Sequence, residues 1–118
     1  MAAGPTDLFG DVVDRYEVDA DSPADFAIKI TGDSMEPFFP DGSIQLGEWG
    51  TALKTGDIGV FLLNGGPLCK QFVRDNFGNL YLNSLNRDRS DADVTISASG
   101  NDTLTCYGKI ICDPIPVQ

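Results

Sequence analysis

Two side chains of this sequence stand in settings that favour nucleophilic chemistry, and the first is Lys70. It alternates with Leu68 and Phe72 in an apolar segment, so a strand there would turn all three toward the same face. If that face is the core, burial disfavours the charged amine, lowers the pKa of Lys70 and makes it a general base. The alternative is a lysine whose stem covers apolar surface while its ammonium group stays in water.

Ser34 is the candidate nucleophile that such a base could activate. It lies in a loop just after Gly32, a residue that lets the backbone turn tightly. Consecutive backbone N–H groups at a bend of this kind can point the same way and form an oxyanion hole. The alternative is a serine that caps a short helical turn, with Glu36 nearby. The local sequence leaves both roles open.

Composition excludes several other kinds of chemistry. The 118 residues include no histidine, so the chain cannot build a Ser-His-Asp triad, a Cys-His dyad or a His-ligated metal site. Cys69, Cys106 and Cys112 are odd in number and have no CxxC spacing. This pattern predicts reduced thiols in a cytosolic protein. We expect no metal and no other cofactor.

Charge and hydropathy narrow the class of partner. Eighteen acidic residues against eight basic ones give a net charge of -10, which argues against binding of a phosphate backbone by this chain alone. No segment approaches the roughly 20 apolar residues of a membrane span, and the N-terminus does not resemble a signal peptide. We therefore expect a cytoplasmic protein without membrane contact.

The elements that must position Lys70 and Ser34 are short strands. Residues 1–25 are acidic and predict an arm or linker, whereas residues 26–118 predict one compact, mainly antiparallel β domain with at most one or two short helical turns. Residues 64–66 indicate a hairpin turn, and residues 86–93 a polar loop. The predicted strands are 26–30, 43–46, 58–63, 68–74, 80–82, 94–96 and 104–112.

Over residues 26–112 the sequence resembles the LexA-like serine peptidase family, which includes LexA, phage repressors and UmuD-type proteins. The blocks that carry the resemblance are Gly32-Asp33-Ser34-Met35-x-Pro37, Pro40-Asp41-Gly42, Gly56-Asp57-Ile58, Cys69-Lys70-Gln71-Phe72, Leu82-x-Ser84-x-Asn86 and Tyr107-Gly108-Lys109-Ile110-Ile111.

The resemblance implies a Ser-Lys dyad that cleaves a peptide bond of its own chain. Ser34 would be the nucleophile, Lys70 the base that takes its proton, and the backbone N–H groups of Asp33 and Ser34 the oxyanion hole. The family cleaves before a glycine some thirty residues upstream of the serine, which implies the Ala3-Gly4 bond. The alternative is that this Ala-Gly pair does not belong to the natural sequence, because a linker precedes the bond in the family.

The resemblance also implies partners and a biological role. The leading expectation is the C-terminal domain of a transcriptional repressor of the SOS response, which forms a homodimer and inactivates the repressor by cleaving itself. A RecA filament on single-stranded DNA would promote cleavage, and an N-terminal helix-turn-helix domain outside this chain would bind DNA. The alternatives are a UmuD-like mutagenesis factor, a non-cleaving dimerisation module of a phage-like regulator, and a fragment of a signal-peptidase-like enzyme.

Overall fold

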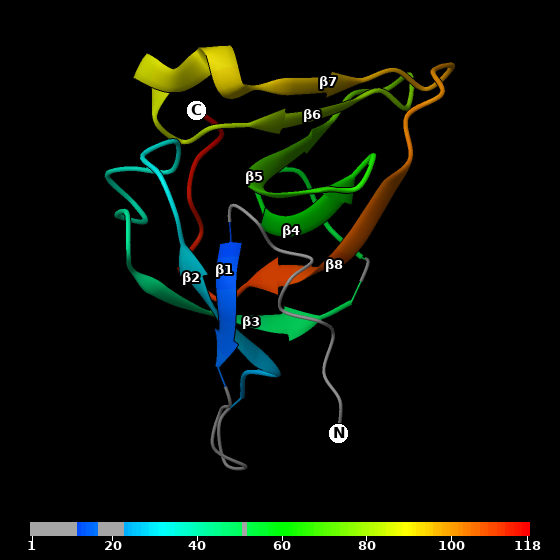
Figure 1. The fold of residues 1–118 in the computed structure, drawn as a ribbon. Helices are drawn as coiled ribbons and strands as arrows, with labels where there is room; N and C mark the ends of the chain where they lie inside the picture. The colour runs from blue at the N-terminus through cyan, green and yellow to red at the C-terminus, as the bar shows by residue number, and fades with distance from the viewer. Residues whose placement is uncertain (1–11, 17–22, 51) are drawn as a thin grey trace.

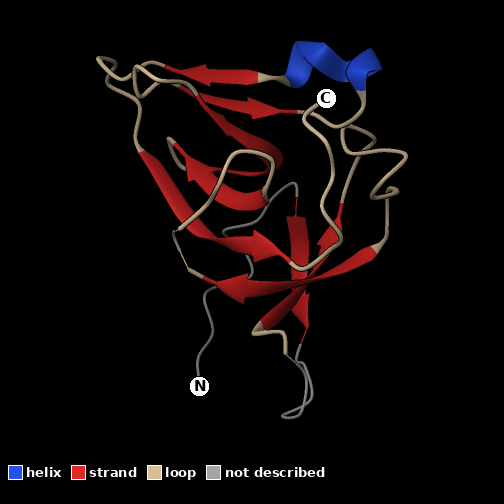
Figure 2. Ribbon diagram, turned by 180° about the vertical axis from the view of Figure 1, so that it is seen from behind, coloured by secondary structure: helices blue, strands red, loops and turns tan. Residues whose placement is uncertain are grey.

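The computed structural model describes residues 12–16, 23–50 and 52–118, which form one antiparallel sheet of eight strands (Figure 1). The strand order in the sheet is β1-β2-β3-β8-β4-β5-β6-β7. Strands make up nearly all of the regular structure of the described residues, and the only helix among them is the 3₁₀ helix η2 (Figure 2). The elements are β1 (Val12–Tyr16), β2 (Phe26–Ile30), β3 (Ile44–Trp49), β4 (Ile58–Leu63), β5 (Gly66–Arg74), β6 (Leu80–Asn83), η2 (Arg87–Ala92), β7 (Val94–Ile96) and β8 (Leu104–Ile110).

The mainly β fold predicted from the sequence is confirmed. The hairpin between β4 and β5 turns through Asn64 and Gly65, whose φ angles are 49° and 88°. Positive φ at both central residues is the conformation whose twist matches that of the flanking strands, and it favours the Asn-Gly pair. This turn sets the register in which Gly59 lies opposite Lys70.

Two segments differ from the sequence prediction. Residues 12–16 of the predicted arm form β1, which pairs antiparallel with β2; residues 1–11 and 17–22 lie outside the described residues. Part of the predicted polar loop at residues 86–93 is η2, whose first turn is capped by the side chain of Asn86 accepting from the N–H of Asp88. None of the residues of η2 is buried, so the helix has no apolar periodicity by which the sequence could have indicated it.

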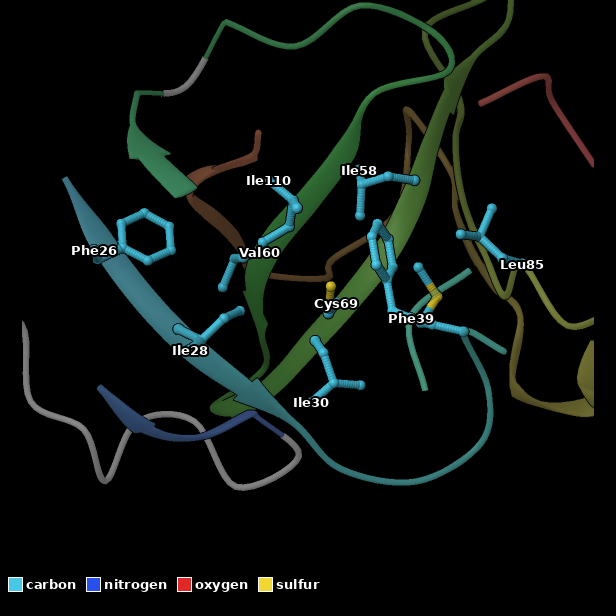
Figure 3. Packing of buried hydrophobic residues seen from close by; sticks show 10 residues of the cluster. Phe26, Ile28, Ile30, Phe39, Ile58, Val60, Cys69, Leu85 and Ile110 are labelled. Carbon is cyan, nitrogen blue, oxygen red and sulfur yellow. The ribbon is translucent and has the colours of Figure 1, made fainter. Parts of the chain in front are cut away.

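The core consists of two apolar clusters on either side of β4 and β5. Ile58 and Val60 of β4 belong to the first cluster, while Phe61 belongs to the second, because successive side chains of a strand point to opposite faces. The first cluster also contains Met35 and Leu85, and Figure 3 shows how its side chains gather between β2 and the β4–β5 hairpin. Burial on both faces explains why β4 is apolar throughout.

The C-terminal segment is attached to the domain by Gln71, which is fully buried. Its Nε2 donates to the carbonyl oxygens of Ile115 at 3.0 Å, Pro116 at 3.2 Å and Gly56 at 3.2 Å, and its Oε1 accepts from the N–H of Gln118 at 3.1 Å. One side chain of β5 thus binds the end of the chain at several points.

In the part of the chain that the structure describes, no helix has both the length and the apolar character needed to cross a bilayer.

Candidate active site

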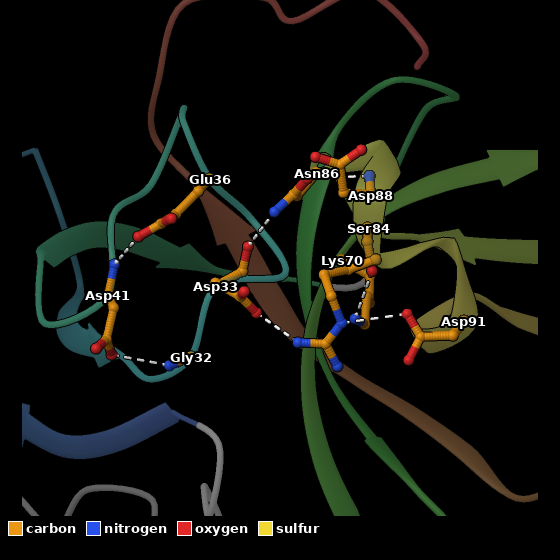
Figure 4. A network of polar contacts seen from close by, with 10 residues as sticks. Gly32, Asp33, Glu36, Asp41, Lys70, Ser84, Asn86, Asp88 and Asp91 are labelled. Atoms are coloured by element: carbon orange, nitrogen blue, oxygen red, sulfur yellow. Dashed lines mark hydrogen bonds and ion pairs between the residues drawn. The ribbon is translucent and has the colours of Figure 1, made fainter.

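Lys70 lies in the middle of β5 and is buried, with only 5% of its surface exposed. Its Nζ donates a hydrogen bond of 3.0 Å to Oγ of Ser84, a residue with no exposed surface (Figure 4). Leu68 and Phe72, its neighbours on the same strand face, pack in the second apolar cluster. The amine therefore lies inside the domain. In the alternative interpretation, the ammonium group would have stayed in water.

Ser84 is held in place by an ion pair next to it. The N–H of Ser84 donates to Oδ1 of Asp93 at 2.8 Å, and Nη1 of Arg87 donates to the carbonyl oxygen of Ser84 at 2.8 Å. Arg87 and Asp93 also form a salt bridge of 2.8 Å. These contacts hold the backbone of Ser84 at both its N–H and its carbonyl group, and so position the residue whose hydroxyl binds Lys70.

Two carboxylates lie within electrostatic range of Lys70. The hydrogen bond from Arg89 lowers the pKa of Asp91, and the charge of Lys70 adds to that effect. Burial raises the pKa of Asp93, but hydrogen bonds from Arg87 and a backbone N–H, with the charges of Arg87 and Lys70, outweigh burial and leave it lowered. Each of these carboxylates also has an arginine partner.

Ser34 is half-buried in the loop between β2 and β3, and the loop is anchored by its own side chains. Met35 and Phe39 are buried in the first apolar cluster. The bend before the serine has Gly32 at a φ of 90°, and the N–H of Gly32 donates to Oδ1 of Asp41 at 2.8 Å. Glycine adopts a positive φ readily, in agreement with the tight turn predicted at Gly32.

A third segment joins this loop to the lysine. The backbone N–H of Asn86 donates to the carbonyl oxygen of Ser34 at 2.9 Å, and Nδ2 of Asn86 donates to the carbonyl oxygen of Asp33, also at 2.9 Å. Leu85 packs in the first apolar cluster together with Met35. Residues 84–86 thus contact the loop of Ser34 and the amine of Lys70 within three positions of sequence (Figure 4).

An exposed arginine adds a further contact to the same loop. Nη1 of Arg89 in η2 donates to the carboxylate of Asp33, and its Nε donates to the carboxylate of Asp91 at 3.1 Å. Ion pairs at the surface contribute little to stability, because water and salt screen them. Arg89 therefore supports the loop from outside, and the buried contacts contribute more to its placement.

The loop also presents backbone donors. The N–H groups of Asp33, Ser34 and Met35 donate no hydrogen bond to any acceptor among the described residues. Neighbouring N–H groups that lack a protein partner beside a half-buried hydroxyl are the arrangement that can bind a developing oxyanion.

The cysteines do not offer a competing nucleophile. Burial raises the pKa of Cys69 to about 12, and the nearby charge of Lys70 offsets only part of that effect. Burial also raises the pKa of Cys106 and of Cys112. All three are free thiols, which stay protonated and weakly reactive at neutral pH. Among the described residues, no group of three or more Cys, Asp or Glu side chains could hold a metal ion.

Sequence reasoning singled out Ser34 and Lys70 but assigned no role to Ser84, Asn86 or Arg89. Ser84 and Asn86 did belong to a block resembling the LexA-like family, and their position directly after a predicted strand was the available signal. Ala3 and Gly4, the predicted cleavage site, lie outside the described residues.

The described residues thus form an antiparallel β domain in which residues 84–86 contact both the Ser34 loop and the buried Lys70. Comparison with family models matches residues 5–111 to the Peptidase S24-like family. The match covers most of the chain, and the protein belongs to this family. Membership confirms the LexA-like resemblance and implies serine peptidase chemistry in general, although some members are inactive. A search of curated proteins found no match.

We predict that Ser84→Ala destabilises the domain by about 1–3 kcal/mol, because it removes the buried acceptor of the Lys70 hydrogen bond. Urea unfolding followed by circular dichroism measures the change. The matched control is Ser90→Ala, which removes an exposed hydroxyl from η2 and should change the free energy of unfolding by less than about 0.5 kcal/mol. Equal effects of the two substitutions would contradict a structural role for the buried bond.

Proposed function

We propose that the chain is the self-cleaving, dimerising part of a LexA-type transcriptional repressor, with Ser34 as nucleophile and Lys70 as general base. The observation that carries the proposal is the buried amine of Lys70, hydrogen-bonded to Ser84 two residues before the asparagine that binds the Ser34 loop. Burial of a lysine amine costs stability, and this cost favours a functional role for Lys70. Family membership supports the same chemistry.

The proposed reaction is an acyl transfer through Ser34. Lys70 in its neutral form takes the proton from Ser34 Oγ as that oxygen bonds to the carbonyl carbon of the scissile peptide, and the carbonyl oxygen becomes an oxyanion. Collapse breaks the C–N bond, and Lys70 gives the proton to the leaving amine. Water then hydrolyses the acyl-serine and restores the hydroxyl. The proposed scissile bond is Ala3-Gly4.

Deprotonation of Lys70 depends on two opposing effects. Burial lowers the pKa of a lysine, while nearby carboxylates raise it. Asp91 and Asp93 are each also paired with an arginine. The proposed role of Lys70 as general base requires that burial has the larger effect on its pKa.

The repressor proposal assigns DNA binding to a helix-turn-helix domain outside this chain and promotion of cleavage to a RecA filament on single-stranded DNA. The net charge of -10 is consistent with a part that does not itself bind DNA. We propose a cytoplasmic location because the three cysteines are free thiols, as is usual in a reducing compartment.

Dimerisation is supported by exposed apolar side chains along neighbouring strands. Ile44 and Leu46 of β3 are 48% and 41% exposed, and both point to one face of the strand. Ile111 follows β8, is 38% exposed, and its N–H donates to the carbonyl oxygen of Leu46 at 2.8 Å. Adjacent apolar side chains of this size favour burial against a second copy of the chain.

We predict that the protein cleaves itself at alkaline pH. Incubation at about pH 9–10 raises the neutral fraction of a lysine whose pKa lies below the free value of about 10.4, and intact-mass measurement should show loss of residues 1–3 and a new N-terminus at Gly4. Ser34→Ala and Lys70→Ala should each abolish the product, whereas the control Lys29→Ala should retain it. Cleavage that survives Ser34→Ala would refute the dyad, and an intact dimeric wild type would indicate a non-cleaving dimerisation module.

We also predict that the Lys70 amine titrates below the ~10.4 of a free lysine. A lysine whose folded pKa is lowered costs stability at pH values below that pKa, because burial disfavours its charged form, and the cost shrinks as pH rises through the folded pKa toward the unfolded value. Nitrogen-15 NMR of the lysine side chains in the uncleaved Ser34→Ala protein measures the midpoint, with the Lys54 resonance as internal reference. A Lys70 midpoint at or above 10.4 would rule out the desolvated base.

Dimerisation gives a prediction that is independent of cleavage. Sedimentation equilibrium at tens of micromolar should give twice the 12.7 kDa chain mass. Leu46→Lys should shift the population to monomer, because a charge on this face opposes its burial. Phe77→Lys is the matched control, since Phe77 is 83% exposed in the turn between β5 and β6. A wild-type monomer at this concentration would remove the dimerisation role.

A further inference from the structure

Three of the hydrogen bonds of Asn86 fix the orientation of its side chain and that of the Ser34 loop. Its backbone N–H and its Nδ2 bind the carbonyl oxygens of Ser34 and Asp33, each at 2.9 Å. Its Oδ1 accepts from the N–H of Asp88 at 3.1 Å, so the side-chain amide cannot rotate without breaking a bond at either end. The loop therefore meets a rigid partner through two consecutive carbonyls.

The direction of those carbonyls determines the direction of the neighbouring N–H groups. In a planar trans peptide the C=O and the N–H point in opposite directions. The only cis peptide among the described residues precedes Pro37, so the units on both sides of Ser34 are trans. By binding the carbonyl oxygens of Asp33 and Ser34, Asn86 turns the N–H groups of Ser34 and Met35 away from itself. Neither the Ser34 N–H nor the Met35 N–H donates to an acceptor in the described part of the chain.

We propose that Asn86 is a positioning residue that aims the Ser34 N–H at the oxyanion formed when Ser34 attacks a peptide carbonyl. This inference rests on the proposed self-cleavage and assigns that reaction a residue that contacts neither the substrate nor the proton in transfer. The N–H of Glu36 also donates to the Asp33 carbonyl, but at 3.2 Å. The shorter bond from Asn86 is the one that comes from outside the loop and ties it to the segment binding Lys70.

A purely structural role for Asn86, as the cap of η2, is separable from the positioning role. Asn86→Asp and Asn86→Ser both keep the backbone N–H and an oxygen that can accept from the N–H of Asp88, since Asp and Ser are good caps. The aspartate and serine side chains lack the amide donor to the Asp33 carbonyl. Asn101→Asp is the matched control for the added charge, because Asn101 is exposed in the segment before β8.

The experiment measures the self-cleavage rate of the full chain between pH 7 and 11 in wild type and these three variants. Both Asn86 variants should lose at least about tenfold in the limiting rate at high pH, in line with the cost of disturbing an oxyanion donor. Asn86→Ser should keep the wild-type midpoint of the pH profile, because Lys70 and Ser84 are unchanged. The melting temperatures should stay within a few degrees of wild type, and Asn101→Asp should cleave at the wild-type rate.

A second measurement does not depend on the cleavage site. A fluorophosphonate forms a bond between Ser34 Oγ and phosphorus, fluoride leaves, and the serine proton goes to Lys70, while the phosphoryl oxygen occupies the oxyanion position. Intact mass follows the adduct. Labelling should slow in both Asn86 variants in parallel with cleavage, and Ser34→Ala should give no adduct.

The outcomes separate the two proposals. A wild type that cleaves or is labelled, with Asn86 variants reacting at the same rate, overturns the positioning role and leaves the Ser-Lys dyad standing. An Asn86→Ser variant that shows a shifted pH midpoint with an unchanged limiting rate also overturns it, because the effect would then act on the base. A wild type that neither cleaves nor is labelled overturns the dyad and the positioning role together.

Discussion

The hydrogen bond between the Lys70 amine and the Ser84 hydroxyl is the interaction on which the arrangement of the site depends. A buried amine loses its water and needs protein partners in return, and the cost of leaving it without them is large. Ser84 supplies one such partner, and its backbone is held in turn by Asp93 and Arg87. The network therefore runs from the interior to a surface ion pair, and each member fixes the next. Networks of this kind are stable only when each polar group in them is satisfied.

The topology of the sheet makes this network possible. β5 lies between β4 and β6, with an apolar cluster on each side. Lys70 comes from β5 and Ser84 directly follows β6, so their meeting needs only the pairing of neighbouring strands, in which Gln71 lies opposite Asn83. The Ser34 loop lies between β2 and β3, and neither of these strands is a neighbour of β5 in the sheet. Other contacts must therefore hold the loop against the segment that binds Lys70. Met35 and Phe39 supply the apolar part of it and Asn86 the polar part.

The sequence predicted the features that depend on local pattern. Alternation of apolar residues predicted most strands and indicated that Lys70 faces the core. The Asn-Gly pair predicted the β4–β5 hairpin. Alternation states which face a side chain occupies but not which residue it meets there. The contact between Asp33 and Asn86 joins positions 53 apart, so no local pattern could indicate it. β1 was missed for a related reason: Val12–Tyr16 stands among acidic residues, and its pairing with β2 is a tertiary effect. The 3₁₀ helix has no buried residue and therefore shows no apolar periodicity in the sequence.

Gln71 and Lys70 are adjacent on β5, and this adjacency limits how the chain can change in length. Neighbouring strand residues face opposite ways, so one binds the C-terminal segment while the other meets Ser84. Inserting or deleting a single residue between the Asn64-Gly65 turn and Lys70 would exchange the two faces. A deletion would move the Gln71 amide to the position of the Lys70 amine. An insertion would move the charge of Lys70 to the position of Gln71, against the carbonyl oxygens of the C-terminal segment. Length variation in this hairpin is therefore confined to the turn itself or to steps of two residues, which keep each side chain on its own face.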